Sequence, residues 1–162
     1  MILTGDEIKK EVTKGNIIID PFTENQINPN SYNYRIGNEI LILEEGEFIK
    51  KKISKKGFLL EPHQIYLANT FEILGSESFA MNLIGRSSLG RLGLFLQVSA
   101  NLGHTGSIHK WTLELVATKP IRIYPNMIIG QISFWLNKGE IKQYKDGYSL
   151  FNKPRESLVI IK

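Results

Sequence analysis

The sequence GRSSLGRLGL, residues 85–94, joins two short apolar runs at residues 81–84 and 94–98. Its arginines Arg86 and Arg91 can bind phosphate oxygens bidentately, and the hydroxyls of Ser87 and Ser88 can donate to the same oxygens. Its glycines allow the backbone to approach an anion closely. The composition therefore predicts a phosphate-binding turn between two strands, although it does not say which anion binds.

Short runs of β-branched, aromatic and aliphatic residues recur on both sides of this turn. Pro, Gly, Asn and charged residues separate them at nearly regular spacing. This pattern is typical of an all-β sandwich or barrel. The further runs are residues 17–19, 40–43, 58–60, 65–68, 71–74, 111–116, 121–124 and 128–135.

One short helix is predicted at the N-terminus. Thr4 is a suitable N-cap, and Glu7 stands three residues later, as in a capping box. Ile8 and Val12 share one helical face, and Gly15 suits the position just beyond a helix end. The fold expected from the residues is therefore mainly β with one N-terminal helix.

A single carboxylate interrupts the apolar run Trp111-Thr112-Leu113-Glu114-Leu115. In a strand, Glu114 points away from Leu113 and Leu115, and its apolar neighbours suggest partial burial. Such a carboxylate beside a phosphate-binding turn suggests nucleotide chemistry. On pattern alone, a glutamate on the solvent face of an ordinary strand is the more common interpretation.

Composition excludes several classes of protein. The 162 residues include no cysteine, and the three histidines have no zinc-site spacing. No apolar run approaches bilayer length, and the first residues lack a signal-peptide pattern, so we expect a cytoplasmic protein that does not bind membranes. The net charge of +4 favours an anionic partner. However, the lysines at 50–52, 55 and 56 suggest a solvated hairpin, and no nucleic-acid-binding face is expected.

No linker, repeat or low-complexity tract divides the sequence, so residues 1–162 are expected to form one domain. Residues 138–162 are mixed in character and contain Tyr144, Gly147, Tyr148 and Phe151. We expect this segment to form a mobile C-terminal lid.

These motifs resemble the dCTP deaminase branch of the dUTPase superfamily over nearly the whole chain. The segments 85–94 and 112–115 are similar to the family blocks GRSSLARLGL and TLEL, and together they are quite specific. Three further segments match the family's opening, its PxSxDLRLG block and its LEPG turn: residues 18–22, 28–37 and 60–62.

The resemblance implies a distorted β-barrel or jelly roll that assembles as a homotrimer with active sites between subunits. It also implies zinc-independent deamination of a pyrimidine deoxynucleoside triphosphate, with Mg²⁺ held by the substrate phosphates. By the same resemblance, Glu114 relays protons, Ser87 and the carbonyl of Ala100 hold the attacking water, and Arg91 orders the site. Arg86 and Ser88 would bind phosphates.

The family resemblance does not decide the roles of two residues in the segment 28–37. Ser31 and Arg35 are either part of the site or structural, with a buried arginine tying loops together, since buried charges need partners.

The chain departs from the family pattern at two places near the expected site. His104 stands where the family has an aspartate that contacts the sugar and, in dUTPases, activates water. This histidine either binds a sugar hydroxyl or a phosphate, or is a turn residue without a chemical role. In the lid, Tyr148 is kept while a flanking lysine and glutamine are lost, and Lys145 and Lys153 are candidates to replace them.

The leading hypothesis is hydrolysis of dCTP to dUTP and ammonia. One alternative is a dUTP diphosphatase or a bifunctional enzyme that forms dUMP and pyrophosphate, and the aspartate missing at His104 counts against it. A further alternative is a non-catalytic nucleotide-binding trimer or a deaminase of another cytosine nucleotide.

Overall fold

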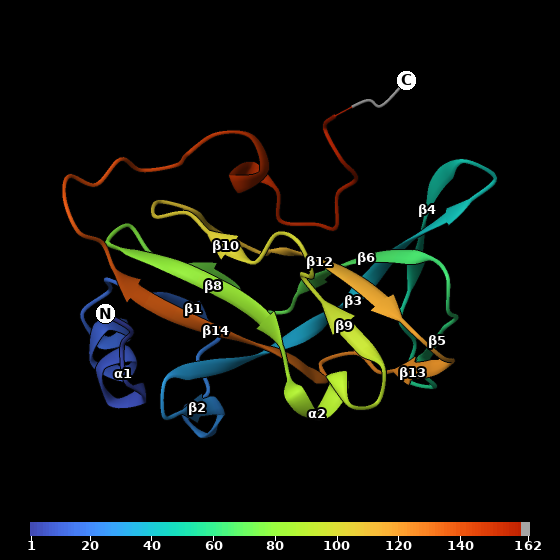
Figure 1. Ribbon diagram of the computed structural model, residues 1–162, viewed down its shortest axis with the longest axis horizontal. Helices are drawn as coiled ribbons and strands as arrows, with labels where there is room; N and C mark the ends of the chain where they lie inside the picture. Colours follow the sequence, from blue (N-terminus) through green and yellow to red (C-terminus); the bar gives the residue numbers. More distant parts are fainter. Residues whose placement is uncertain (160–162) are drawn as a thin grey trace.

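The computed structural model describes residues 1–159 and has a mainly β fold with a short N-terminal helix, as the sequence predicted (Figure 1). The helical elements are α1 (Gly5–Thr13), η1 (Glu24–Gln26), α2 (Ser87–Gly90) and η2 (Gly147–Leu150). The strands are β1 (Ile18–Asp20), β2 (Ile27–Asn28), β3 (Ser31–Glu44), β4 (Glu47–Lys52), β5 (Phe58–Leu60), β6 (Ile65–Thr70), β7 (Ile73–Gly75), β8 (Phe79–Gly85), β9 (Leu94–Leu96), β10 (Leu102–Gly103), β11 (Ile108–His109), β12 (Thr112–Ala117), β13 (Ile121–Ile123) and β14 (Ile128–Leu136).

Helix α1 begins and ends where its capping residues predicted. The Thr4 hydroxyl accepts a hydrogen bond from the Glu7 amide at 3.4 Å, while the Glu7 carboxylate pairs with Lys10 instead of completing the capping box. Gly15 follows the helix with φ +78°, a conformation that glycine adopts without a steric penalty. No helix within residues 1–159 is long and apolar enough to cross a membrane.

The main sheet has nine strands, and seven of them form one continuous path. Their order is β10-β8-β14-β3-β6-β12-β9, with β2 and β4 pairing on β3. Smaller sheets are β1-β7-β11 and β13-β5. Ten of the fourteen strands overlap the predicted apolar runs, whereas β2, β4, β10 and β11 do not. Strand β12 shows the expected alternation of buried and partly exposed side chains.

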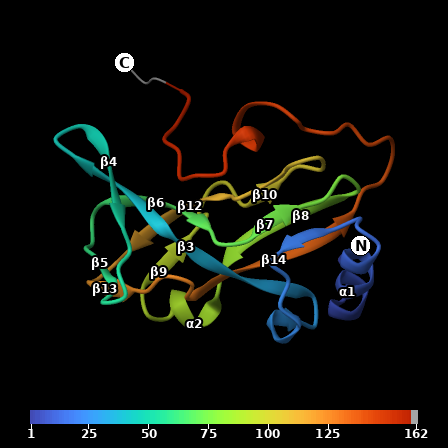
Figure 2. The ribbon, with the colours of Figure 1, turned by 180° about the vertical axis from the view of Figure 1, so that it is seen from behind.

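Two short connections force this sheet to curl. Strands β9 and β10 lie at opposite ends of the path, yet only residues 97–101 join them. A flat sheet would place its first and seventh strands roughly 29 Å apart, whereas this connection spans at most about 20 Å. The turn at residues 86–93 likewise links β8, next to one end, with β9 at the other. The sheet therefore curls into the half-barrel seen from both sides (Figures 1 and 2).

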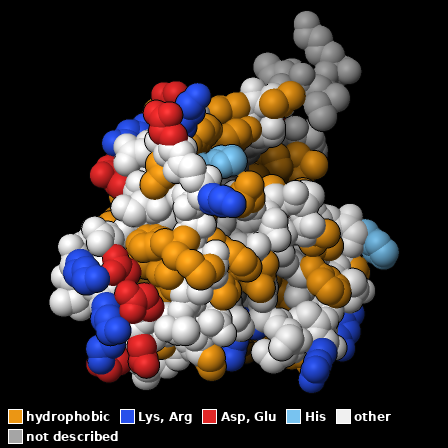
Figure 3. Space-filling view, turned by 60° about the vertical axis from the view of Figure 1, so that its left-hand side comes forward, with side chains coloured by type: hydrophobic (Ala, Val, Ile, Leu, Met, Phe, Trp, Pro, Cys, Tyr) orange, Lys and Arg blue, Asp and Glu red, His pale blue; other side chains and the backbone are white. Residues whose placement is uncertain are grey.

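Apolar side chains also reach the surface. Figure 3 shows hydrophobic side chains gathered across one face of the molecule. Several exposed apolar residues belong to the two connections or to the strands beside them, and their exposed fractions lie between 43% and 74%: Ile84, Leu92, Phe95, Val98 and Leu102.

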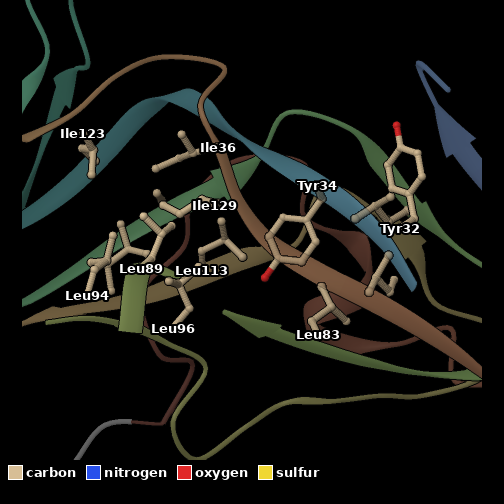
Figure 4. Packing of buried hydrophobic residues seen from close by; sticks show 14 of the residues in the cluster. Tyr32, Tyr34, Ile36, Leu83, Leu89, Leu94, Leu96, Leu113, Ile123 and Ile129 are labelled. Carbon is tan, nitrogen blue, oxygen red and sulfur yellow. The ribbon is translucent and has the colours of Figure 1, made fainter. Parts of the chain in front are cut away.

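The core fills the inside of the curled sheet. Tyr34 is fully buried, donates its hydroxyl hydrogen to the Ile84 carbonyl, and packs so closely on Gly130 that a larger residue there would clash (Figure 4). Burial raises the pKa of Tyr34 above its usual range. Leu113 and Leu96 point into the same core, so Glu114, the next residue along β12, points outward.

Arg35 is part of a buried ion pair. Its Nε donates to the Glu72 carboxylate at 2.6 Å and its backbone amide donates to the other oxygen at 2.9 Å. Glu72 is fully buried, and the guanidinium lies 4.5 Å from the centre of the Phe71 ring. Ser31 donates to Gln131 at 3.0 Å. Of the two alternatives for this block, these contacts support the structural one.

Replacing Glu72 by alanine should lower the free energy of unfolding by about 3–5 kcal/mol, because it leaves a largely buried guanidinium without its partner. Chemical denaturation followed by tryptophan fluorescence measures this change. The control is Glu77→Ala, which removes a pair with Lys145 whose side chains are 58% and 59% exposed and should cost less than about 1 kcal/mol. Equal losses at the two positions would contradict the assigned role of Glu72.

Candidate functional site

A cavity of about 550 Å³ lies between the outer face of the main sheet and the C-terminal segment, residues 138–159. Strands β6 and β12 form its floor, residues 97–109 form one side, and the segment covers it. Most of the lining surface is apolar, although ten of the eighteen lining residues have polar or charged side chains. It comprises Phe48, Ile65, Leu67, Gln97, Ala100, Leu102, His104, Ser107, His109, Trp111, Thr112, Glu114, Tyr144, Tyr148, Ser149, Arg155, Glu156 and Ser157.

Glu114 brings a carboxylate to the floor of this cavity. It lies opposite Leu67 of β6, and the alternation of β12 sends it outward while Leu113 and Leu115 enter the core. The side chain is half-buried. Within residues 1–159 its carboxylate has no hydrogen-bond or ion-pair partner, so its oxygens can accept hydrogen bonds from a bound ligand or water.

Gln97 connects Glu114 to Ala100. Its side-chain oxygen accepts from the Glu114 amide at 2.7 Å, and its side-chain nitrogen donates to the Ala100 carbonyl at 3.2 Å. Gln97 is buried and has φ +50°, which is uncommon for a residue other than glycine. Sequence reasoning missed this residue, since its only signal was a polar side chain inside the apolar run 94–98.

His104 and Tyr148 also reach the cavity. His104 is exposed at its edge, and its ring centre lies 5.4 Å from that of Tyr144. The Tyr148 hydroxyl accepts from the Leu158 amide at 2.8 Å, and this bond, with a further one to Ser157, lowers the pKa of Tyr148.

The C-terminal segment is docked on residues 103–110 of its own chain. The Tyr144 amide donates to the Thr105 carbonyl at 2.8 Å, and the Lys110 amide donates to the Asn152 side chain at 3.0 Å. A further contact joins His109 Nδ1 to the Phe151 carbonyl at 3.1 Å. The segment therefore covers the cavity as a lid would. Its mobility stays a prediction, and residues 160–162 of the predicted lid lie outside the described part of the chain.

The segment supplies a cation that the sequence did not single out. Arg155 lines the cavity, and its guanidinium lies 5.1 Å from the centre of the Phe151 ring. Of the two lysines considered as replacements, Lys145 pairs with Glu77 at 3.2 Å, and neither it nor Lys153 lines the cavity.

The remaining predicted residues lie elsewhere. Helix α2 and its flanking arginines are on the opposite side of the sheet from the C-terminal segment (Figures 1 and 2). Neither guanidinium forms an ion pair within residues 1–159, so both can bind an anion. The predicted set thus divides in two, with Glu114, Ala100, His104 and Tyr148 at the cavity and Arg86, Ser87, Ser88 and Arg91 at α2.

No group of three or more His, Cys, Asp or Glu side chains within residues 1–159 is arranged to hold a metal ion. Fold and site together define a β-rich protein with a ligand-sized apolar cavity and one free carboxylate in its floor.

Comparison with known proteins places this arrangement in a family. The profile of the family described as dCTP deaminase-like matches residues 2–137. Proteins named "dCTP deaminase, dUMP-forming" from Hathewaya histolytica, Cytophaga hutchinsonii and Clostridium beijerinckii are 45%, 41% and 44% identical to the chain. The alignments cover 91%, 94% and 94% of this chain and 90%, 92% and 92% of those proteins. The chain therefore belongs to the dCTP deaminase-like family.

A solved structure has the same fold. The 2'-deoxycytidine 5'-triphosphate deaminase from Agrobacterium tumefaciens aligns with a TM-score of 0.71 at 18% identity. The match covers 84% of this chain and 48% of that one, so the chain spans about half the length of that protein. The likeness confirms the predicted mainly β fold.

The docking contact of His109 predicts a pH dependence. Burial lowers the pKa of His109, against the opposing effect of hydrogen bonds to the Lys110 and Phe151 carbonyls. The unfolded chain therefore binds this proton first as the pH falls, so stability should decrease below about pH 6.5. Melting temperatures measured across this range should fall less steeply for His109→Gln than for the unchanged protein. Equal slopes would contradict this role.

Proposed function

We propose that this protein hydrolytically deaminates dCTP and carries the product on to dUMP. The observation that supports this best is the unpartnered, half-buried carboxylate of Glu114 in the floor of a ligand-sized apolar cavity. The relatives that are 41–45% identical over most of the chain carry the name dCTP deaminase, dUMP-forming, and this favours the bifunctional alternative.

Glu114 is suited to move both protons of the attacking water. The water oxygen adds to C4 of cytosine, and one of its protons ends on N3. The second passes to the amino group, the C4–N bond breaks, ammonia leaves and the C4 carbonyl forms. A single carboxylate can accept and return each proton in turn. The Ala100 carbonyl, also at the cavity, can accept a hydrogen bond from the same water.

The apolar walls suit a pyrimidine. Leu67 and Trp111 line the cavity beside Glu114, and the Trp111 indole is fixed by donating to the Leu74 carbonyl at 2.9 Å. A ring held between such side chains displaces water, which strengthens its hydrogen bonds with the few polar groups present.

We propose that the phosphate-binding turn acts in a neighbouring copy of the chain. Arg86 and Arg91 flank α2, do not line their own chain's cavity and are unpaired within residues 1–159. Exposed apolar residues lie close to them in the sequence: Ile84, Leu92 and Phe95. An apolar surface around free arginines suits an interface between subunits that brings the turn to the partner's cavity. A homotrimer provides such an interface. The triphosphate would enter as its magnesium complex, with Mg²⁺ held by phosphate oxygens and water.

His104 favours a second candidate, deamination that stops at dUTP. By the family resemblance, an aspartate is expected at this position, and in dUTPases it activates water. Here His104 takes its place and lies exposed at the edge of the cavity. Its imidazole can still contact a sugar hydroxyl or a phosphate.

Purified protein incubated with dCTP and Mg²⁺ should release ammonia, dUMP and pyrophosphate, resolved by chromatography with separate ammonia and pyrophosphate assays. Glu114→Gln should lower the rate of ammonia release by about 10²–10⁴-fold while nucleotide binding is largely kept. The matched control is Glu156→Gln, which changes a carboxylate of the same cavity that belongs to the C-terminal segment. Accumulation of dUTP without pyrophosphate would select the second candidate, and normal turnover by Glu114→Gln would refute the role of Glu114.

Active sites shared between subunits can be tested by complementation. Arg86→Ala should weaken nucleotide binding, because a charge-assisted phosphate contact is lost. Co-expressed Arg86→Ala and Glu114→Gln chains should regain about a quarter of the normal sites if random assembly combines the two residues from different subunits. In mixed trimers purified through two different tags, about one site in three should be active, because the inactive homotrimers have been removed. Absence of any recovery in verified mixed oligomers would place both residues in one chain's site.

A further inference from the structure

Gln97 uses its side chain to complete the last hydrogen-bonded residue pair between β9 and β12. The ladder pairs Leu115 with Leu96, so the next pair is Glu114 with Gln97. The Gln97 amide donates to the Glu114 carbonyl at 3.2 Å, as a regular rung requires. The return bond is different, because the Glu114 amide donates to the Gln97 side-chain oxygen and not to its backbone carbonyl.

The left-handed backbone of Gln97 explains why its side-chain oxygen, and not its backbone carbonyl, accepts the hydrogen bond from Glu114. At φ +50° the chain turns away from β12, towards the connection 97–101 that closes the sheet. Without another acceptor, the Glu114 amide would be left unpaired beside the cavity, at a cost of about 1–3 kcal/mol. The carboxamide supplies that acceptor, and its nitrogen then reaches the Ala100 carbonyl on the far side of the turn.

We infer that Gln97 is a positioning residue that fixes the Ala100 carbonyl relative to Glu114 and so sets where the attacking water sits. This inference rests on the proposed deamination. A carbonyl oxygen has two lone pairs, so the bond from Gln97 leaves one for water. Ala100 is exposed and lies in a connection between strands, where few other contacts hold its carbonyl in place.

A carboxamide is chemically suited to this position. It offers an acceptor and a donor at its two ends, so one side chain ties both groups together. A glutamate keeps the acceptor but loses the donor, and a methionine of similar length loses both. Neither replacement is β-branched, so both tolerate the left-handed backbone about as well as glutamine.

The test compares Gln97→Glu and Gln97→Met in two measurements. Both variants should lower kcat for ammonia release by about 10- to 100-fold, since a small misplacement of the water has an effect of this size. Binding of dCTP, measured in each variant combined with Glu114→Gln, should stay within about threefold of that in Glu114→Gln alone, because the water and not the nucleotide is misplaced. Hydrogen exchange at the Glu114 amide should remain slow in Gln97→Glu and become faster in Gln97→Met.

The control is Gln131→Met, the same change at a β14 position whose side chain accepts from Ser31 away from the cavity, and it should leave kcat unchanged. A normal kcat in Gln97→Glu would overturn the inference. So would a loss of dCTP binding as large as the loss of kcat, because Gln97 would then contact the nucleotide itself. If the unchanged protein does not deaminate dCTP, the proposed function itself fails. If the Glu114 amide exchanges hydrogen at the same rate in Gln97→Glu and Gln97→Met, its hydrogen bond to the Gln97 side chain is refuted.

Discussion

The curvature of the main sheet depends on how little chain joins its two outermost strands. Only residues 97–101 connect β9 with β10. Residues 86–93 connect β8, the neighbour of β10, with β9 at the other end of the sheet. Both connections carry residues expected to do chemistry. The segment that joins the two ends of the curled sheet therefore also positions Gln97 and Ala100 beside Glu114 on β12. Closure of the sheet and assembly of the site are consequences of the same short connections.

Much of the fold followed from local patterns. Strands were predicted at most of the apolar runs because alternation and turn residues are local signals, and the outward direction of Glu114 followed from Leu113 and Leu115. The pairing of Arg35 with Glu72 was not predictable, because it joins residues 37 positions apart. Gln97 was missed for a similar reason, since its role comes from a backbone turn and a partner on another strand. Arg155 becomes a cavity residue only through the path of the C-terminal segment.

Two glutamates show how environment separates structural from chemical roles. Glu72 is fully buried and accepts hydrogen bonds from the backbone and side chain of Arg35. Glu114 is half-buried, and within the described residues only its backbone is bonded. A carboxylate whose oxygens already accept hydrogen bonds from the protein stabilises the fold, whereas one without such partners beside a cavity can bind a ligand or water. The same side chain serves both purposes because the strands around it differ.

The C-terminal segment is held mainly by single hydrogen bonds to residues 103–110, such as those from Tyr144 to Thr105 and from His109 to Phe151. Water can replace each of these bonds, so we expect the segment to detach without unfolding the main sheet. We therefore expect access to the cavity to be a local event on the timescale of loop motion rather than of unfolding. On this expectation, the release of a product depends on how fast the C-terminal segment detaches.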